Sequence, residues 1–121
     1  MMQDLPMITQ QMLLDINPTF RWWPRIDIDH IESRHHRQTL ESGQFCYMDS
    51  VSLDLVLKAV LNYGKVIEAY KYCGKPRWRV AANFWVPIGF DAATGDPTHK
   101  VTVRFCLHDW KIGTAYPGGV P

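Results

Sequence analysis

Residues 101–117 read VTVRFCLHDWKIGTAYP, in which two strand-like segments flank a short turn at residues 108–110. β-Branched and aromatic residues favour strands and are dense on both sides of that turn. We therefore expect strands over residues 100–107 and 111–115. Thr114 and Tyr116 are two residues apart, and side chains alternate along a strand, so both hydroxyl groups should lie on one face of the sheet.

The same pattern begins further upstream, directly after Gly64. Residues 65–73 and 77–86 predict two more strands, with turns at residues 73–76 and around residues 91–97. Strands that follow one another through short turns are typical of an antiparallel sheet.

The first half of the chain predicts helices. Residues 6–16 have helical spacing, residues 30–42 form a second candidate helix with Asp29 as its N-cap and Gly43 as its stop, and a third begins at Asp49 or Ser50. A short strand is expected at residues 44–48. The third helix has an apolar stripe at spacings of three and four, formed by Leu53, Val56, Leu57, Val60 and Leu61. Helices followed by strands predict an α+β fold, with N-terminal helices packed on a C-terminal antiparallel sheet.

Composition indicates one folded domain over residues 1–121. Hydrophobic residues make up 46% of the chain and charged residues 21%, which excludes a disordered chain. No segment is long and apolar enough for a transmembrane helix, and the start lacks the pattern of a signal peptide. The three cysteines, Cys46, Cys73 and Cys106, form no C-x-x-C pair, and we expect buried thiols in a reducing compartment.

Charge is divided unevenly along the chain. Residues 1–57 hold four Lys and Arg against eight Asp and Glu, whereas residues 58–121 hold nine against four. The C-terminal half is thus the half suited to contact phosphates. A division of this size also occurs in proteins that bind no nucleic acid.

Residues 30–37, HIESRHHR, are the candidate source of a base. On an ideal helix His30, Arg34 and Arg37 share one face, whereas His35 is rotated by about 140° from His30. His30 with Arg34 is therefore the better pair, unless the segment is irregular and His35 also takes part. A neutral histidine can take a proton from a ribose hydroxyl, and an arginine offers a planar fork to phosphate. The alternative is a solvated charged face without function.

Thr114 and Tyr116 are poor bases at neutral pH, so their expected role is to donate hydrogen bonds to a phosphate oxygen. The segment 65–79 interleaves basic and aromatic residues, as RNA-contacting surfaces do, although an ordinary exposed hairpin has the same composition. Candidate RNA contacts are Arg37, Lys71, Arg77, Arg79, Lys100 and Arg104. Trp22 and Trp23, which stand beside arginines at an expected turn between helices, are interpreted as core residues.

No metal or other cofactor is expected. The histidines lack the spacing of an H-E-x-x-H helix, and the cysteines are too scattered for a zinc site. A base, arginines and hydroxyl groups without a metal cage suit transesterification of RNA, which leaves a 2′,3′-cyclic phosphate.

Several short motifs together resemble a known family. They are His-Ile-x-x-Arg-His at residues 30–35, a strand around Phe45, a helix that begins near Ser50, Ile88-Gly89 ahead of Thr94-Gly95, and Thr-Ala-Tyr-Pro at residues 114–117. In this order the chain resembles, over residues 26–117, the C-terminal RNase domains of bacterial polymorphic toxins and contact-dependent growth-inhibition proteins. These domains form the barnase/EndoU/colicin/RelE-like group, which includes a bacterial RNase A-like branch.

The resemblance implies a monomeric, metal-independent endoribonuclease, often acting on tRNA. Such a domain is secreted as part of a larger toxin, acts in the cytoplasm of a target bacterium in interbacterial competition, and is neutralised by a cognate immunity protein. The site residues that carry over are His30, Arg34 or His35, Thr114 and Tyr116. Residues 40–50 contain no arginine, where some members have a catalytic one, so the basic role falls to Arg34, Arg37, Lys100 or Arg104.

Two other functions fit the same residues. The chain could be a non-catalytic RNA- or protein-binding module of the same fold, or a structural domain of a larger secreted protein. A binding module should be harmless when expressed, whereas an active RNase should be toxic without its inhibitor.

Overall fold

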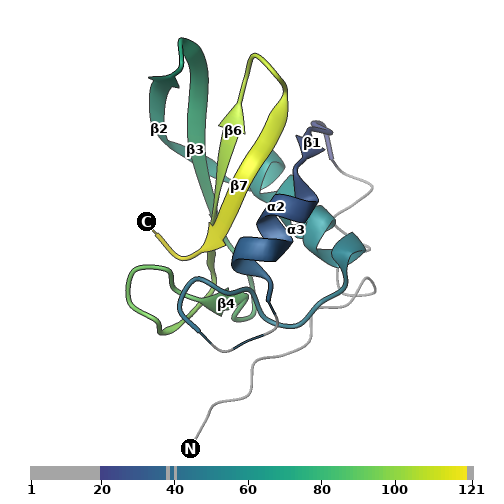
Figure 1. Ribbon diagram of the computed structural model, residues 1–121, viewed down its shortest axis with the longest axis vertical. Helices are drawn as coiled ribbons and strands as arrows, with labels where there is room; N and C mark the ends of the chain where they lie inside the picture. Colours follow the sequence, from purple (N-terminus) through teal and green to yellow (C-terminus); the bar gives the residue numbers. More distant parts are fainter. Residues whose placement is uncertain (1–19, 38, 40, 120–121) are drawn as a thin grey trace, which may run out of the picture.

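The structure, a computed structural model, describes residues 20–37, 39 and 41–119. The elements follow in the order β1 (Arg25–Ile26), α2 (Ile28–His35), α3 (Ser50–Tyr63), β2 (Lys65–Tyr72), β3 (Lys75–Asn83), β4 (Gly89–Phe90), β5 (Pro97–Thr98), β6 (Lys100–Cys106) and β7 (Lys111–Pro117). Apart from the short β1, the strands follow the two helices and form a mostly antiparallel sheet, which confirms the predicted α+β class (Figure 1).

The main sheet has five strands in the order β1-β7-β6-β3-β2. All neighbouring pairs are antiparallel except β1 and β7, which are parallel. A second sheet consists of β4 and β5 alone. The hairpins β2–β3 and β6–β7 extend beyond the helices at one end of the molecule (Figure 1).

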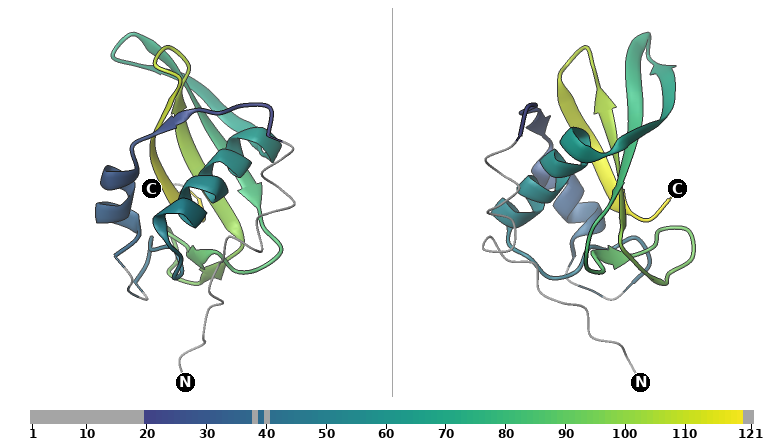
Figure 2. Two further views of the ribbon diagram at one scale, coloured as in Figure 1. Left: turned by 90° about the vertical axis from the view of Figure 1, so that its right-hand side faces the viewer. Right: turned by 180° about the vertical axis from the view of Figure 1, so that it is seen from behind.

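The core lies between α3 and one face of the sheet. α3 runs across that face (Figure 2) and contributes the fully buried Leu53, Val56, Leu57 and Val60. Apolar residues at alternate positions of the strands pack against it, among them Val80, Val103, Phe105, Ile112 and Ala115. The helix begins where the sequence predicts, because the Asp49 side chain accepts a hydrogen bond of 2.7 Å from the Ser52 N–H.

Polar side chains occupy the other positions of the same strands. Strand register aligns Glu68 with Arg79, Arg79 with Arg104, and Arg104 with Thr114, so these four side chains form one row across β2, β3, β6 and β7. Arg104 pairs with Thr114 while Phe105 pairs with Ile112, so Gly113 forms a bulge in β7. The bulge allows Thr114 to lie on the same face as Arg104 while Ile112 lies on the core face. We call the surface that carries this row the open face.

The second helix is shorter than predicted. It begins at Ile28 rather than residue 30, with Asp27 rather than Asp29 as N-cap, and it ends at His35 rather than residue 42. The buried Gln44 side chain donates to the Arg34 carbonyl at 2.7 Å and accepts from the Arg37 N–H at 2.8 Å. Because a tertiary contact satisfies these backbone groups, the helix can stop before its Gly43 stop signal.

Other boundaries also differ. The prediction of a strand at residues 44–48 is wrong, because only Phe45 forms a β-bridge there, to Gly89. The strand expected at residues 77–86 covers Lys75–Asn83. The short strands β1, β4 and β5 were not predicted, and at two residues each they carry no periodic signal. The helix expected at residues 6–16 lies outside the described residues.

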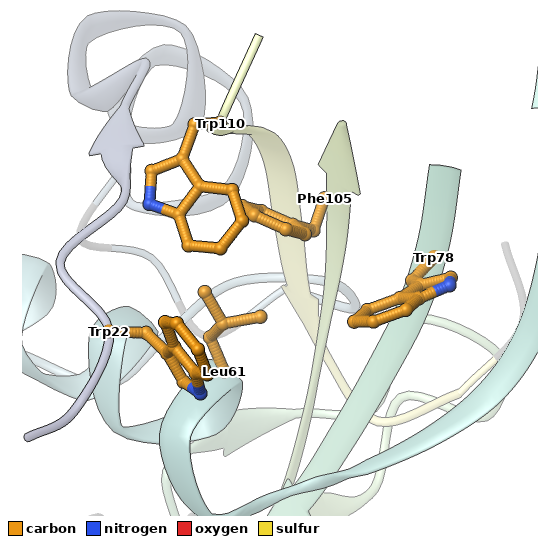
Figure 3. A pocket seen from close by; sticks show the side chains of 5 residues that line it. All are labelled: Trp22, Leu61, Trp78, Phe105 and Trp110. Atoms are coloured by element: carbon orange, nitrogen blue, oxygen red, sulfur yellow. The ribbon is translucent and has the colours of Figure 1, made fainter. Parts of the chain in front are cut away.

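Two expectations of burial were wrong. Trp22 and Trp23 are 40% and 53% exposed, and Cys73 is exposed in the β2–β3 turn, where it adopts a φ of 53°. Trp22 instead forms one wall of an apolar hollow of about 230 Å³ (Figure 3). Its other walls are Leu61, Trp78, Phe105 and Trp110.

β2 forms one edge of the main sheet and is largely exposed along its length. Val66 and Ile67 are about half exposed, and a bulge interrupts the pairing with β3 between Val66 and Glu68. Within the described part of the chain, no helix is long and apolar enough to cross a membrane.

The packing of α3 predicts a contrast between two substitutions on that helix. Leu57→Ala removes a fully buried side chain and should lower the free energy of unfolding by about 2–5 kcal/mol. Val51→Ala, at a position 56% exposed, should change it by no more than about 0.5 kcal/mol. Urea denaturation measures both, and equal losses would contradict the assignment of this core.

Candidate active site

His35, the last residue of α2, lies beside β7 with one ring nitrogen fixed. Its Nδ1 is 2.8 Å from the Gly43 carbonyl oxygen, and its own carbonyl accepts from the Phe45 N–H at 2.7 Å. A carbonyl oxygen only accepts hydrogen bonds, so Nδ1 must carry the proton. Nε2 of the neutral ring then keeps its lone pair and can act as a base.

The surroundings of His35 favour the neutral ring. Burial lowers the pKa of His35 below its ordinary value of 6.5. The hydrogen bond to Gly43 opposes this change, while the charges of His30, Arg34 and Arg37 act in the same direction as burial. The neutral form of His35 is therefore favoured at pH 7, with a proton on Nδ1 and with Nε2 available to accept another.

Tyr116 connects His35 to the arginines of the open face. The two ring centroids are 6.1 Å apart, and the Tyr116 side chain is almost completely buried. Its hydroxyl oxygen lies 3.4 Å from Nη1 of Arg79, which donates to it. Tyr116 thus contacts His35 through its ring and Arg79 through its hydroxyl group.

The two central arginines differ in their partners. Nε of Arg79 lies 2.9 Å from Oε1 of Glu68, whereas Arg104 donates from Nη1 to the Tyr70 hydroxyl at 3.3 Å. Burial alone would lower the pKa of Arg104, but the interactions with Tyr70 and Tyr116 outweigh it and raise that pKa. Arg104 remains a cation and, among the described residues, forms no ion pair.

Thr114 completes the row. It is half-buried on β7, in register with Arg104, and two residues before Tyr116. The predicted common face of Thr114 and Tyr116 is confirmed by the register, which aligns Thr114 with Arg104 and Tyr116 with Thr102. The open face therefore carries a hydroxyl group and two guanidinium groups, and the neutral His35, at the end of α2, lies against Tyr116.

Other residues singled out from the sequence are more scattered. His30 and Arg34 are exposed on α2, and Arg37, beyond the end of that helix, forms an ion pair of 3.1 Å with Glu41. Lys71 alternates with Tyr70 and Tyr72 and so points away from the open face, while Arg77 and Lys100 lie at open-face positions.

Glu68 and Gln44 support the site and were not singled out from the sequence, whereas Tyr70 was considered as one of the aromatic residues of the segment 65–79. Glu68 pairs with Arg79, Tyr70 accepts from Arg104, and Gln44 ends the helix at His35. Glu68 could have been found, because side chains alternate along a strand and Glu68, two residues before Tyr70, must share a face with it. Nothing in the sequence around Gln44 indicates that its side chain would end α2.

The described residues contain no group of three or more His, Cys, Asp and Glu side chains that could hold a metal ion. The deeply buried Cys46 is not a candidate nucleophile, because burial raises the pKa of its thiol to about 12.

Comparisons with known proteins identify no relative of this chain. No family model, no curated protein and no solved structure matches it.

The geometry of His35 predicts a specific NMR signature. At pH 7.5 the ¹⁵N shifts of His35 should report a protonated Nδ1 and an unprotonated Nε2, because the Gly43 carbonyl requires a donor. Titration should give His35 a pKa below 6.5, since burial disfavours the charged ring. A ring protonated at Nε2, or a pKa above 6.5, would contradict this description.

Proposed function

We propose that this chain is a metal-independent endoribonuclease that cleaves RNA by transesterification. The observation that carries the proposal is His35, a neutral histidine whose Nδ1 is bound to Gly43 and whose ring lies against Tyr116, the residue whose hydroxyl group accepts a hydrogen bond from Arg79 of the open face. A base beside fixed cations is the arrangement that attack by a ribose hydroxyl on phosphate requires.

In the proposed reaction Nε2 of His35 takes the proton of the 2′-hydroxyl. The 2′-oxygen attacks the adjacent phosphorus, the bond from phosphorus to the 5′-oxygen breaks, and that oxygen takes up a proton from solvent. The products are a 2′,3′-cyclic phosphate and a 5′-hydroxyl end. His35 then releases its proton to solvent, so the proposed reaction requires no oxidant, reductant or metal.

The other side chains would stabilise charge on the phosphate. Arg104 carries a positive charge without an ion pair among the described residues, and Thr114, opposite it, can donate a hydrogen bond to a non-bridging oxygen. Tyr116 is too deeply buried to contact RNA directly, so we assign it a positioning role through Arg79. This differs from the direct contact expected from the sequence.

The biological setting follows from the motifs at residues 30–35 and 114–117, which resemble those of bacterial toxin domains. We extend the proposal accordingly: the chain is the toxic domain of a larger secreted protein, acts on RNA such as tRNA in the cytoplasm of a target bacterium, and is neutralised by an immunity protein. The excess of basic residues after residue 57 supports an RNA substrate.

Substitution of His35 tests the catalytic proposal. His35→Asn preserves a donor near the Gly43 carbonyl but removes the Nε2 base, and should lower the rate of cleavage by about 10²–10⁴-fold. The rate is measured on total bacterial RNA in EDTA, with end-group analysis of the fragments. The wild-type fragments should end in 2′,3′-cyclic phosphate.

His99→Asn is the matched control, because Nδ1 of the exposed His99 is also bound to a carbonyl oxygen, that of Phe84 at 2.9 Å. It should leave cleavage unchanged. Loss of activity in His30→Asn with full activity in His35→Asn would return the base role to His30. Cleavage abolished by EDTA would refute the proposal, and binding of intact RNA by folded wild-type protein would favour the non-catalytic binding module.

The pH dependence of cleavage should reflect the same histidine. Because the pKa of His35 lies below 6.5, the base is already deprotonated above pH 6.5, and kcat/KM should fall only as the pH decreases through that lowered pKa. A pH–rate profile from pH 4.5 to 8 measures this acid limb. A limb centred above pH 6.5 would point to a different base.

A further inference from the structure

A hollow of about 150 Å³ lies on the open face, beside the row of four side chains that runs across β2, β3, β6 and β7. It is lined by Tyr70, Tyr72, Arg77 and Arg104. Arg77 pairs with Tyr70 across the β2–β3 hairpin, one row closer to its turn than Arg79. Arg104 therefore belongs both to that row and to the wall of this hollow.

Each tyrosine in the hollow has a guanidinium group near its ring. Cζ of Arg77 lies 5.1 Å from the centroid of Tyr72, and Cζ of Arg104 lies 5.9 Å from that of Tyr70. Tyr72 is nevertheless 62% exposed, so much of its surface is available to a ligand. Among the described residues neither arginine forms an ion pair, so both retain charge for an anion.

This combination fits a planar, anionic ligand. An aromatic ring offers a face for stacking, and a guanidinium group offers a fork to phosphate. A cavity of about 150 Å³ accommodates one benzene ring, so this hollow has room for one heterocycle. The apolar hollow of Figure 3 has a similar aromatic character, but the described residues that line it include no arginine or lysine to hold a phosphate.

We infer that this hollow is a subsite for one nucleobase of the RNA substrate, next to the scissile phosphate. The base stacks on Tyr72, while Arg77 and Arg104 contact the phosphates on either side of its nucleotide. The inference rests on the proposed endoribonuclease function, since it assigns the ligand as substrate. Recognition by stacking tolerates every base, so the subsite contributes affinity rather than sequence specificity.

Binding measurements can separate the contribution of the base to affinity from the contribution of the phosphates. In a His35→Asn background, which slows cleavage, fluorescence anisotropy compares a labelled ten-nucleotide RNA of mixed sequence with an abasic ribose-phosphate chain of the same length. The RNA should bind on the order of ten-fold more tightly, as expected for stacking of one base on an aromatic ring. Tyr72→Ala should remove most of this difference, and Tyr72→Phe should retain it.

Tyr63→Ala is the control, because Tyr63 is 53% exposed at the end of α3 rather than on the open face. It should leave the preference for RNA over the abasic chain unchanged. Equal affinities for the two ligands in the presence of Tyr72 would overturn the stacking role and indicate recognition of phosphate or another acidic group alone.

Cleavage assays distinguish failure of this inference from failure of the proposed function. With His35 intact, Tyr72→Ala should lower kcat/KM for RNA by the same factor as it lowers affinity. If the wild-type protein cleaves RNA and Tyr72→Ala changes neither binding nor kcat/KM, the subsite is refuted while the endoribonuclease stands. If the wild-type protein leaves RNA intact, the endoribonuclease is refuted, and base-dependent binding lost in Tyr72→Ala would still support a nucleobase site.

Discussion

The burial of one face of β3, β6 and β7 beneath α3 determines where every other side chain of these strands can lie. Val80 and Val103 must face the helix, so Arg79 and Arg104, their neighbours in sequence, must face the opposite side. The hydrophobic core thus positions the arginines without contacting them. A shift of register by one residue would bury the guanidinium groups and expose the core, so the register of the sheet and the composition of the open face are selected together.

Local patterns in the sequence were sufficient for the elements with strong periodicity. The stripe of α3, its Asp49 cap and the four long strands each carry their own signal, and all were predicted to within a few residues at their ends. The end of α2 was not predictable in this way, because it depends on the side chain of Gln44, which comes from a different segment. Reasoning from an ideal helix consequently favoured His30, whereas the contact with Tyr116 is made by His35.

Two like charges lie next to each other on the open face, at a cost in stability. Arg79 and Arg104 stand directly opposite each other on β3 and β6, and like charges in such pairs repel. Glu68 offsets part of this repulsion, and the hydroxyl groups of Tyr70 and Tyr116 accept hydrogen bonds from the arginines without neutralising them. These contacts therefore hold two like charges in fixed positions on adjacent strands.

Because β2 lies at the edge of the sheet, the residues of its hairpin affect whether a strand of another chain can add to it. An edge strand has unpaired backbone N–H and C=O groups, to which a strand of another chain can add, and exposed apolar residues such as Val66 and Ile67 make that addition more favourable. The bulge after Val66 and the flanking lysines Lys65 and Lys71 oppose it, because they distort the edge and repel a second copy. The bulge and these lysines thus disfavour the addition of a second strand at this edge, and a hairpin with apolar residues in their place would lose that protection.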